Sequence, residues 1–409
     1  MKKNKFIKII CSITFCICLM GCTVTGGSGD VYVPDNSPEA SETHKETEEI
    51  SREKAMETAA AYMENMTVEE KVGQLFVVNL ELLDTRNGNF YEWKRFTKVM
   101  KKSLNKYHIG GVILFSRNIA NRKQTKRLIN SLQENSNIPL FITVDEEGGD
   151  VARIASNKKM GTTAFPSMEE IGKNEDASYV YKMGETIGSE IKELGFNVDF
   201  APVADVRTSE LNLEIGSRSF GGEPSKVAQM VSAFVESIQK QGISASLKHF
   251  PGQGSSQGDT HIESVNIDSS ITGLRKNDFV PFEAGIEAGA DFVMVSHISV
   301  SKVTETAQPA SMSKLIMETI LRDELGFKGI VITDAMDMAS ITDTYTPEEA
   351  VYGAISGGAD IVLMPEKLDV AYNEILSKIN DGTISMERLD ASVLRILTVK
   401  FMRIENFKL

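Results

Sequence analysis

The chain has 409 residues, of which 41% are apolar and 25% are charged, an ordinary composition for a globular protein. Its formal net charge of −13 would be repelled by a phosphate backbone, which excludes nucleic-acid binding as its function. The length suits two or three typical domains, but (β/α) barrels commonly reach this size as one domain.

The first 21 residues are predicted to be a secretory leader. Four lysines within residues 1–8 precede an apolar stretch, residues 9–20, that is too short to span a bilayer comfortably. Residues 19–22, Leu-Met-Gly-Cys, resemble the box of bacterial lipoproteins, whose cysteine becomes the lipidated first residue after cleavage. We therefore expect a lipoprotein signal peptide over residues 1–21, with Cys22 anchoring the protein outside the cytoplasm on the bacterial cell membrane. An uncleaved leader would also tether the protein to a membrane.

Residues 22–52 are predicted to be a disordered tether between this anchor and a folded domain over residues 53–409. The tether contains Gly, Ser, Pro, Thr and Glu and almost no large apolar residues, so it cannot bury enough surface to offset the entropy of ordering. All four cysteines lie at positions 11, 16, 18 and 22. The folded domain therefore has no disulfide and no free thiol, and core packing must stabilise it.

Short β-branched runs alternate with longer amphipathic segments throughout the folded domain. Near-continuous apolar runs are typical of strands that are buried on both faces, as in a parallel sheet. The runs predict eight strands, at 73–78, 111–115, 140–144, 197–203, 243–247, 291–295, 329–333 and 360–364.

Helices are expected between these strands. The clearest start is Thr346-Pro347-Glu348-Glu349, which has a capping residue, a proline at the first helical position and acids near the positive end of the dipole. Eight strands with intervening helices predict a single (β/α)₈ TIM-type barrel with enlarged loops. An open doubly wound sheet is the alternative, but no glycine-rich phosphate fingerprint follows the first strand. The predicted helices are 122–134, 177–194, 224–241, 313–325, 347–356 and 386–401.

Polar residues stand at the ends of five of the predicted strands or within three residues after them. The carboxyl ends of barrel strands converge on one rim, where the active sites of barrel enzymes are built. Because unpaired buried polar groups are costly, we expect these residues to line a polar pocket. They are Asp145-Glu146-Glu147 after the third strand, Asp205 after the fourth, Lys248-His249 at the end of the fifth, His297 after the sixth and Asp334 after the seventh.

Asp334 has the placement expected of a nucleophile. It stands between apolar neighbours at the end of a strand, where its carboxylate would be held rigidly in an attack geometry. The alternative is a cap for the following helix, which Asp337 could provide instead.

Asp259 and His261 form a second candidate group. Two residues apart in an extended segment, their side chains point to the same side, so the carboxylate could orient the imidazole and raise its basicity. Glycines 252, 254 and 258 make the segment pliable enough to close over a substrate. A surface contact between the two side chains, without a function, is the alternative.

Five motifs resemble glycoside hydrolase family 3, specifically its β-N-acetylglucosaminidase branch. They occur in the order that the family has, and the resemblance extends from about residue 55 to residue 400. The motifs are Asp145-Glu146-Glu147-Gly148-Gly149 with Arg153, Ile215-Gly216-Ser217-Arg218-Ser219-Phe220, Lys248-His249-Phe250-Pro251-Gly252, Asp259-Thr260-His261 and Ile332-Thr333-Asp334.

The resemblance implies a role for each of these residues. Asp334 would form a covalent glycosyl-enzyme, and His261, assisted by Asp259, would be the acid/base where most retaining glycosidases use a second carboxylic acid. Family chemistry is metal-free and needs no cofactor, and the five histidines of the chain do not form a zinc-binding pattern. The residues that would hold the hydroxyls of the terminal sugar are Asp145, Arg153, Arg218, Lys248 and His249.

Three departures from the branch affect substrate detail. Gln253 stands where the branch commonly has a histidine, and Glu146, in place of a more usual Gln or His, is expected to add charge near the sugar site. Residues 255–258 lack the Asp-Thr that is often found there. His297 could line the floor of the pocket or make structural hydrogen bonds.

The expected protein is a monomeric, lipid-anchored exo-β-N-acetylglucosaminidase that acts on peptidoglycan fragments or chito-oligosaccharides with retention. A β-glucosidase or β-xylosidase of the same family is one alternative, although these generally take a carboxylate acid from a further domain. A phosphorylase is another, because a histidine donor would repel phosphate less than a carboxylate does. A non-catalytic sugar-binding lipoprotein is the third, and the presence of both Asp334 and His261 disfavours it.

Overall fold

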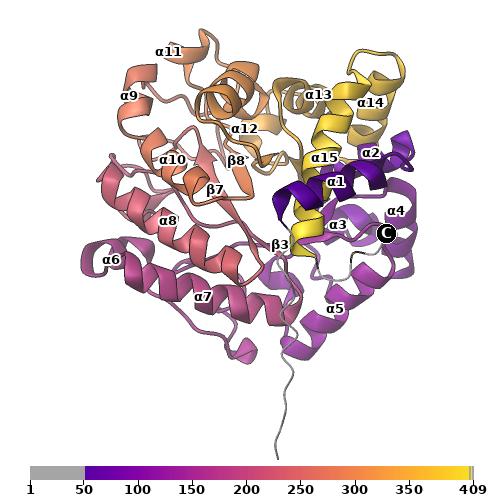
Figure 1. The fold of residues 1–409 in the computed structure, drawn as a ribbon, viewed down its shortest axis with the longest axis horizontal. Coiled ribbons are helices and arrows are strands. Elements are labelled where there is room, and N and C mark those ends of the chain that lie inside the picture. The colour runs from indigo at the N-terminus through magenta and orange to yellow at the C-terminus, as the bar shows by residue number, and fades with distance from the viewer. Residues whose placement is uncertain (1–50, 405–406, 408–409) are drawn as a thin grey trace, which may run out of the picture. The chain divides into compact units, whose positions relative to one another are not determined.

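Eight parallel strands form a closed barrel at the centre of the fold (Figure 1). Neighbouring strands pair in the order β10-β1-β2-β3-β6-β7-β8-β9. The barrel closes just before β10, where the Ile361 N–H donates to Val331 O at 3.1 Å and the Thr333 N–H donates to Ile361 O at 3.0 Å. The strands are β1 (Phe76–Val78), β2 (Gly111–Ile113), β3 (Phe141–Val144), β6 (Val198–Asp199), β7 (Ser244–Phe250), β8 (Phe292–Val295), β9 (Ile330–Thr333) and β10 (Val362–Leu363).

The computed structural model of the protein describes residues 51–404 and 407. The predicted signal peptide, Cys22 and the tether up to residue 50 lie outside these residues. The described part begins with α1 (Arg52–Met63), whose first turn is capped by the Ser51 hydroxyl. Within the described part, no helix has both the length and the apolar character needed to cross a bilayer.

Each barrel strand overlaps the apolar run that predicted it, so the (β/α)₈ architecture is confirmed. The prediction was wrong for residues 73–75, which end helix α2 (Val68–Gln74). The cause is local, because Thr67 and Glu70 form a capping box that starts a helix ahead of β1. Gly73 then lets this helix approach the backbone of Tyr107, where a Cβ atom would lie 2.1 Å from the carbonyl oxygen.

Helices surround the strands in Figure 1. Helices α5 and α7 have the predicted bounds. Helix α13 starts as predicted, with Thr346 as the capping residue and Pro347 at the first helical position. The segment predicted as a helix over 313–325 is a π-helix, η6 (Leu315–Glu324). The helices after α2 are α3 (Leu80–Leu83), α4 (Lys98–Tyr107), α5 (Arg122–Glu134), α6 (Met168–Asn174), α7 (Ala177–Leu194), α8 (Pro224–Lys240), α9 (Ile271–Lys276), α10 (Phe279–Glu287), α11 (Ser301–Thr304), α12 (Ala339–Thr342), α13 (Pro347–Gly357), α14 (Leu368–Asn380) and α15 (Met386–Arg403).

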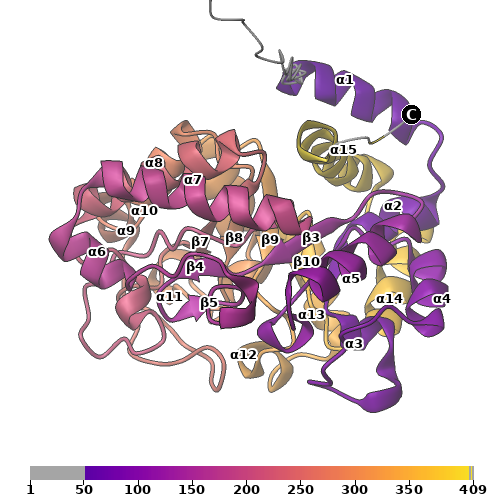
Figure 2. The same ribbon diagram turned by 90° about the horizontal axis from the view of Figure 1, so that it is seen from below.

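Helices α1 and α15 cover the amino-terminal end of the barrel (Figure 2). Tyr62 of α1 packs edge-on against Phe401 of α15, with ring centroids 5.9 Å apart. Arg403 of α15 pairs with Asp291, the residue before β8, at 2.6 Å. This end of the barrel is therefore closed, and the opposite end, with the hairpin of β4 (Glu146–Gly148) and β5 (Val151–Ala152), is left for a site.

Asp360, just before β10, is the buried centre of an ion-pair network. Its carboxylate accepts from Arg322 at 2.6 Å, from Arg395 at 2.9 Å and from the Val331 N–H at 2.9 Å. Asp360→Asn leaves buried guanidinium groups without their counter-charge, so we expect it to lower the free energy of unfolding by about 3–5 kcal/mol. Urea denaturation measures this loss. Asp390→Asn, which breaks the more exposed pair with Lys71, should cost less than about 1 kcal/mol, and equal losses in the two variants would contradict the prediction.

Candidate active site

A cavity of about 500 Å³ opens among the carboxyl-terminal ends of the barrel strands. The predicted residues that do not line the cavity are Glu146, Asp205, His297 and Asp259, and Asp259 lies behind His261. The strands thus bring together in one cavity most of the side chains that the sequence predicted at this rim. The predicted residues that line the cavity are Asp145, Glu147, Arg153, Arg218, Lys248, His249, His261 and Asp334.

The cavity has a buried cluster of alternating charges. The Lys248 ammonium group lies 2.6 Å from a Glu147 oxygen and 2.9 Å from an Asp145 oxygen. Arg218 holds Glu147 through two nitrogens, at 2.7 Å and 2.9 Å. Burial by itself raises the pKa of Glu147, but the two cations outweigh it and hold the pKa far below its usual value. The cluster is therefore ionised, and its donors are fixed before any ligand arrives.

Glu147 was recognised from sequence only as part of the acidic run after β3. Successive side chains of a strand point to opposite sides, and β4 sends Glu147 to the cavity and Glu146 away from it. The Glu146 carboxylate accepts from the backbone N–H groups of Ile154 at 2.7 Å and Ala155 at 2.9 Å. The expectation that Glu146 adds charge near a sugar is therefore wrong, and burial raises its pKa to about 7.

Asp205 orients His249. The Asp205 carboxylate lies 2.7 Å from Nδ1 of His249 and also accepts its backbone N–H at 3.2 Å. Since a carboxylate partner favours a proton on Nδ1, the other ring nitrogen, Nε2, is available near Arg218, 3.5 Å away. The buried Asp205 thus acts behind the cavity-lining imidazole.

His297 makes structural hydrogen bonds. Its Nδ1 lies 2.8 Å from the Ser311 hydroxyl and its Nε2 lies 2.9 Å from the Ala335 carbonyl oxygen. The ring does not line the cavity, and burial lowers its pKa. His297 therefore makes structural hydrogen bonds and does not form the floor of the pocket. These bonds connect the end of β8 to Ala335, the residue after Asp334.

Asp334 is held at the end of β9 by backbone bonds. Its N–H donates to Val295 O at 2.9 Å, and its Oδ1 accepts the Ala335 N–H at 2.7 Å. Burial by itself raises the pKa of Asp334, but the imidazoles of His249 and His297 and the Ala335 N–H hold the pKa below its usual value. The carboxylate is therefore anionic at neutral pH, as a nucleophile must be.

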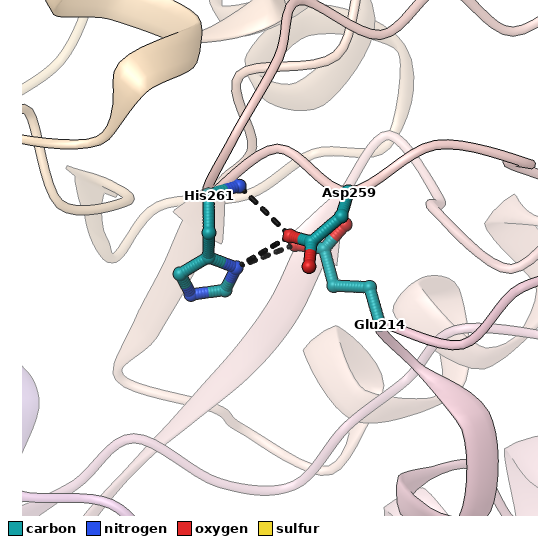
Figure 3. Close-up of side chains that lie close together, drawn as sticks. All are labelled: Glu214, Asp259 and His261. Atoms are coloured by element: carbon teal, nitrogen blue, oxygen red, sulfur yellow. Dashed lines mark hydrogen bonds and ion pairs between the residues drawn. The ribbon is translucent and has the colours of Figure 1, made fainter.

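Two carboxylates hold the His261 imidazole (Figure 3). Its Nδ1 lies 2.9 Å from Asp259 and 3.4 Å from Glu214, and the ring is 61% exposed where it faces the cavity. Bonding to Glu214 raises the pKa of His261 most, and together with Asp259 it outweighs partial burial and places the pKa at about 9. His261 is therefore protonated at neutral pH and can donate a proton to a ligand in the cavity.

Glu214 also fastens the segment that carries His261. Its carboxylate accepts the Thr260 N–H at 3.0 Å, the Thr260 hydroxyl at 2.5 Å and the side-chain amide of Gln253. Gln253, at the position where the branch commonly has a histidine, is thus buried and bonded to the same carboxylate. No sequence pattern indicated Glu214, because 46 residues separate it from Thr260.

The effect of Glu214 on His261 can be measured directly. We expect Glu214→Gln to lower the His261 pKa from about 9 towards 6.5, because the variant removes the larger of the two carboxylate influences. NMR titration of the imidazole resonances measures the pKa, and His261→Gln assigns the signal among only five histidines. Glu210→Gln, which removes an exposed acid paired with Arg207, is the control and should leave the pKa in place. An unchanged pKa in Glu214→Gln would refute the assignment.

A parallel barrel whose rim gathers a strand-end carboxylate and a carboxylate-paired imidazole into one cavity has the architecture of a barrel hydrolase. Residues 67–399 match the model of the glycosyl hydrolase family 3 N terminal domain. The chain belongs to this family, and the resemblance stated from its motifs is confirmed.

Individual relatives agree with this assignment. Beta-hexosaminidase A of Pseudoalteromonas piscicida is 34% identical over 326 residues, which are 74% of this chain and 54% of that protein. The beta-hexosaminidase of Stenotrophomonas maltophilia (strain R551-3) is 35% identical over 275 residues, 65% of this chain and 80% of that protein. A solved glycoside hydrolase family 3 beta-N-acetylglucosaminidase from Paenibacillus sp. str. FPU-7 has a TM-score of 0.77 and 34% identity, over 83% of this chain and 63% of its own. The chain thus spans only part of the length of two of these proteins.

Proposed function

We propose that this protein is a retaining exo-β-N-acetylglucosaminidase, which hydrolyses terminal N-acetylglucosamine from peptidoglycan fragments or chito-oligosaccharides. The observation that carries the proposal is that Asp334, from the end of β9, and His261, from the segment after β7, line the same cavity. The names of the relatives, beta-hexosaminidase and beta-N-acetylglucosaminidase, support the choice of sugar.

The reaction would proceed in two steps. In the first, an Asp334 oxygen attacks the anomeric carbon while Nε2 of His261 gives its proton to the glycosidic oxygen, so the leaving sugar departs as an alcohol and a glycosyl ester forms. In the second, His261 takes a proton from water, whose oxygen attacks the same carbon and releases the Asp334 carboxylate. Two inversions give net retention, and the imidazole, which gave its first proton to the leaving sugar, is protonated again by the proton from water. Asp259 and Glu214 stabilise the imidazolium from the Nδ1 side.

The charged cluster would hold the terminal sugar. Asp145, Arg153, Arg218, Lys248 and His249 present donors and acceptors to the cavity, and the bonds among them fix the positions of these groups in advance. Lys248 and Glu147 are each only 2% exposed, so this part of the cavity ends in the protein and suits the end of a glycan chain.

A substrate panel tests the proposal. Aryl N-acetylglucosaminides, glucosides and xylosides, each with and without phosphate, should show hydrolysis of the N-acetylglucosaminide that phosphate does not accelerate. NMR of the first product should show the β-anomer of N-acetylglucosamine. A preference for glucosides or xylosides, a glycosyl phosphate product, or no turnover of any substrate would each replace the proposal with one of its alternatives.

The proposal also includes the location of the protein, which rests on the sequence of residues 1–22. A lipid on Cys22 would hold the protein on the outer side of the cell membrane, close to peptidoglycan. Cys22→Ser should then move the protein from the membrane fraction to the soluble fraction or leave its leader uncleaved. Normal processing and membrane recovery of this variant would rule out the lipid.

A further inference from the structure

Two residues that line the cavity have an unusual backbone conformation. Among the described residues, the non-glycine residues with positive φ are Phe90, His108, Glu305 and Met364. His108 and Glu305 are the C-caps of α4 and α11, where a left-handed residue commonly ends a helix. Phe90, at φ 61°, and Met364, at φ 47°, cap no helix, and both line the cavity. Strained residues of this kind concentrate at ligand sites, which directs attention to the wall that they form.

Phe90 is also an exposed aromatic residue. It belongs to the segment between α3 and α4, whose path Figure 2 shows, and the residue is 77% exposed. Phenylalanine is usually buried, because its ring gains from leaving water. Because a strained backbone holds this apolar ring exposed at the cavity wall, we infer that a ligand covers the ring when it binds.

The ring has a firm support behind it. The Arg117 guanidinium lies 5.5 Å from the Phe90 ring centroid and 4.2 Å from that of Phe115. Its Nε is bonded at 2.6 Å to the carboxylate of Glu81, which is buried. Because Arg117 is held by this ion pair and packs against Phe115, its cation–π contact holds the Phe90 ring in place.

The position of Phe90 indicates which part of a substrate it meets. The charged cluster around Lys248 and Glu147 is buried, whereas Phe90, His261 and Asp337 are the exposed residues of the same cavity. A terminal sugar bound at the cluster leaves the rest of the glycan to pass out through the exposed part. The leaving sugar, whose oxygen would receive the His261 proton, therefore has Phe90 as its exposed aromatic neighbour.

We propose that Phe90, supported by Arg117, forms a subsite for the second sugar of the substrate. Its ring would stack against the C–H face of a pyranose, as an aromatic ring packs against a flat apolar surface. This inference rests on the proposed function and adds to it the class of leaving group, a pyranose ring that stacks on Phe90 and not merely any aglycone.

Substrates with and without a second ring test the subsite. Phe90→Ala is expected to lower kcat/KM for N,N′-diacetylchitobiose about 5- to 10-fold, mainly through KM, and to leave N-acetylglucosaminyl fluoride within about 2-fold. Phe90→Trp should retain the activity on the disaccharide. Leu211→Ala, which removes another exposed apolar side chain that does not line the cavity, is the control and should change neither substrate. Equal losses on both substrates, or no loss on the disaccharide, would overturn the subsite.

A binding measurement separates this inference from the proposed function. Trp93 is the only tryptophan of the chain and lies three residues after Phe90, so its fluorescence reports on ligands that contact this loop. The disaccharide should bind the wild type more tightly than N-acetylglucosamine does, and Phe90→Ala should remove that difference, whether or not the protein turns over either sugar. Equal affinity of the wild type for the two sugars would overturn the subsite, whereas tight disaccharide binding without turnover would overturn only the proposed reaction.

Discussion

Asp334→Ala is expected to lower kcat by on the order of 10⁴- to 10⁶-fold, the loss seen when a hydrolase loses its covalent nucleophile. Without the carboxylate there is no group at the end of β9 to attack the anomeric carbon. The variant should fold, because the backbone N–H of residue 334 still donates to Val295 O, and the lost side-chain bond is a local one to Ala335.

Azide distinguishes a nucleophile from a merely supporting carboxylate. In Asp334→Ala, azide can occupy the vacated space and attack the anomeric carbon once, so added azide should restore turnover and yield the α-glycosyl azide. Asp343→Asn, at the exposed end of α12, is the matched control and should retain full activity. A residual activity above about one hundredth of wild type, or a β-azide product, would show that Asp334 is not the nucleophile.

His261→Ala is expected to lower kcat/KM by about 10²- to 10⁴-fold on a disaccharide, the usual contribution of a general acid. The loss should be far smaller on a dinitrophenyl glycoside, because that leaving group departs without a proton. His108→Asn, at the end of α4 and outside the cavity, is the control. A loss that is the same for both leaving groups would indicate a binding or folding role instead.

The pH profile tests the same assignment in the unaltered protein. A general acid must carry its proton, and Glu214 and Asp259 raise the pKa of His261 to about 9, so kcat/KM should hold through neutral pH and fall as pH rises through about 9. The acidic limb should lie below the usual pKa of a carboxyl, because the pKa of Asp334 is lowered. Of the other charged side chains that line the cavity, only Asp334 is proposed to change its bonding in the reaction. An alkaline limb near pH 6.5 would show that the two carboxylates do not act on His261.

The barrel strands could be predicted because they carry a local signal. Strands buried on both faces are apolar at nearly every position, and this property is readable without knowing which strand neighbours which. The exception, residues 73–75, carries two signals at once, since these residues directly precede the apolar run of β1 but also end the helix that Thr67 begins. The capping signal prevailed because it satisfies helix-end backbone groups that would otherwise have no partner.

Only the part of the candidate site that lies at strand ends, or within a short stretch of sequence, could be predicted. The parallel barrel brings the carboxyl ends of all its strands to one rim, so the side chains that line the cavity, such as Asp334 and Lys248, could be named from the sequence. Asp259 and His261 were paired by their spacing alone, and they are bonded to each other at 2.9 Å. Each of these predictions used local information only, either the position of a residue at the end of a strand or a spacing of two residues.

Only the tertiary structure decided which groups act behind these side chains. Glu214 meets Thr260 across 46 residues, Glu147 meets Arg218 across 71, and Asp205 meets His249 across 44. These contacts join loops from different strands, so they depend on barrel closure and on loop paths for which no residue pattern exists. The same holds for the exposed ring of Phe90. The sequence by itself therefore determined the barrel and the candidate catalytic groups, because both follow from local periodicity, strand ends and short spacings. The charged groups that contact those candidates could be identified only from the tertiary structure, because they come from loops that are distant in the sequence.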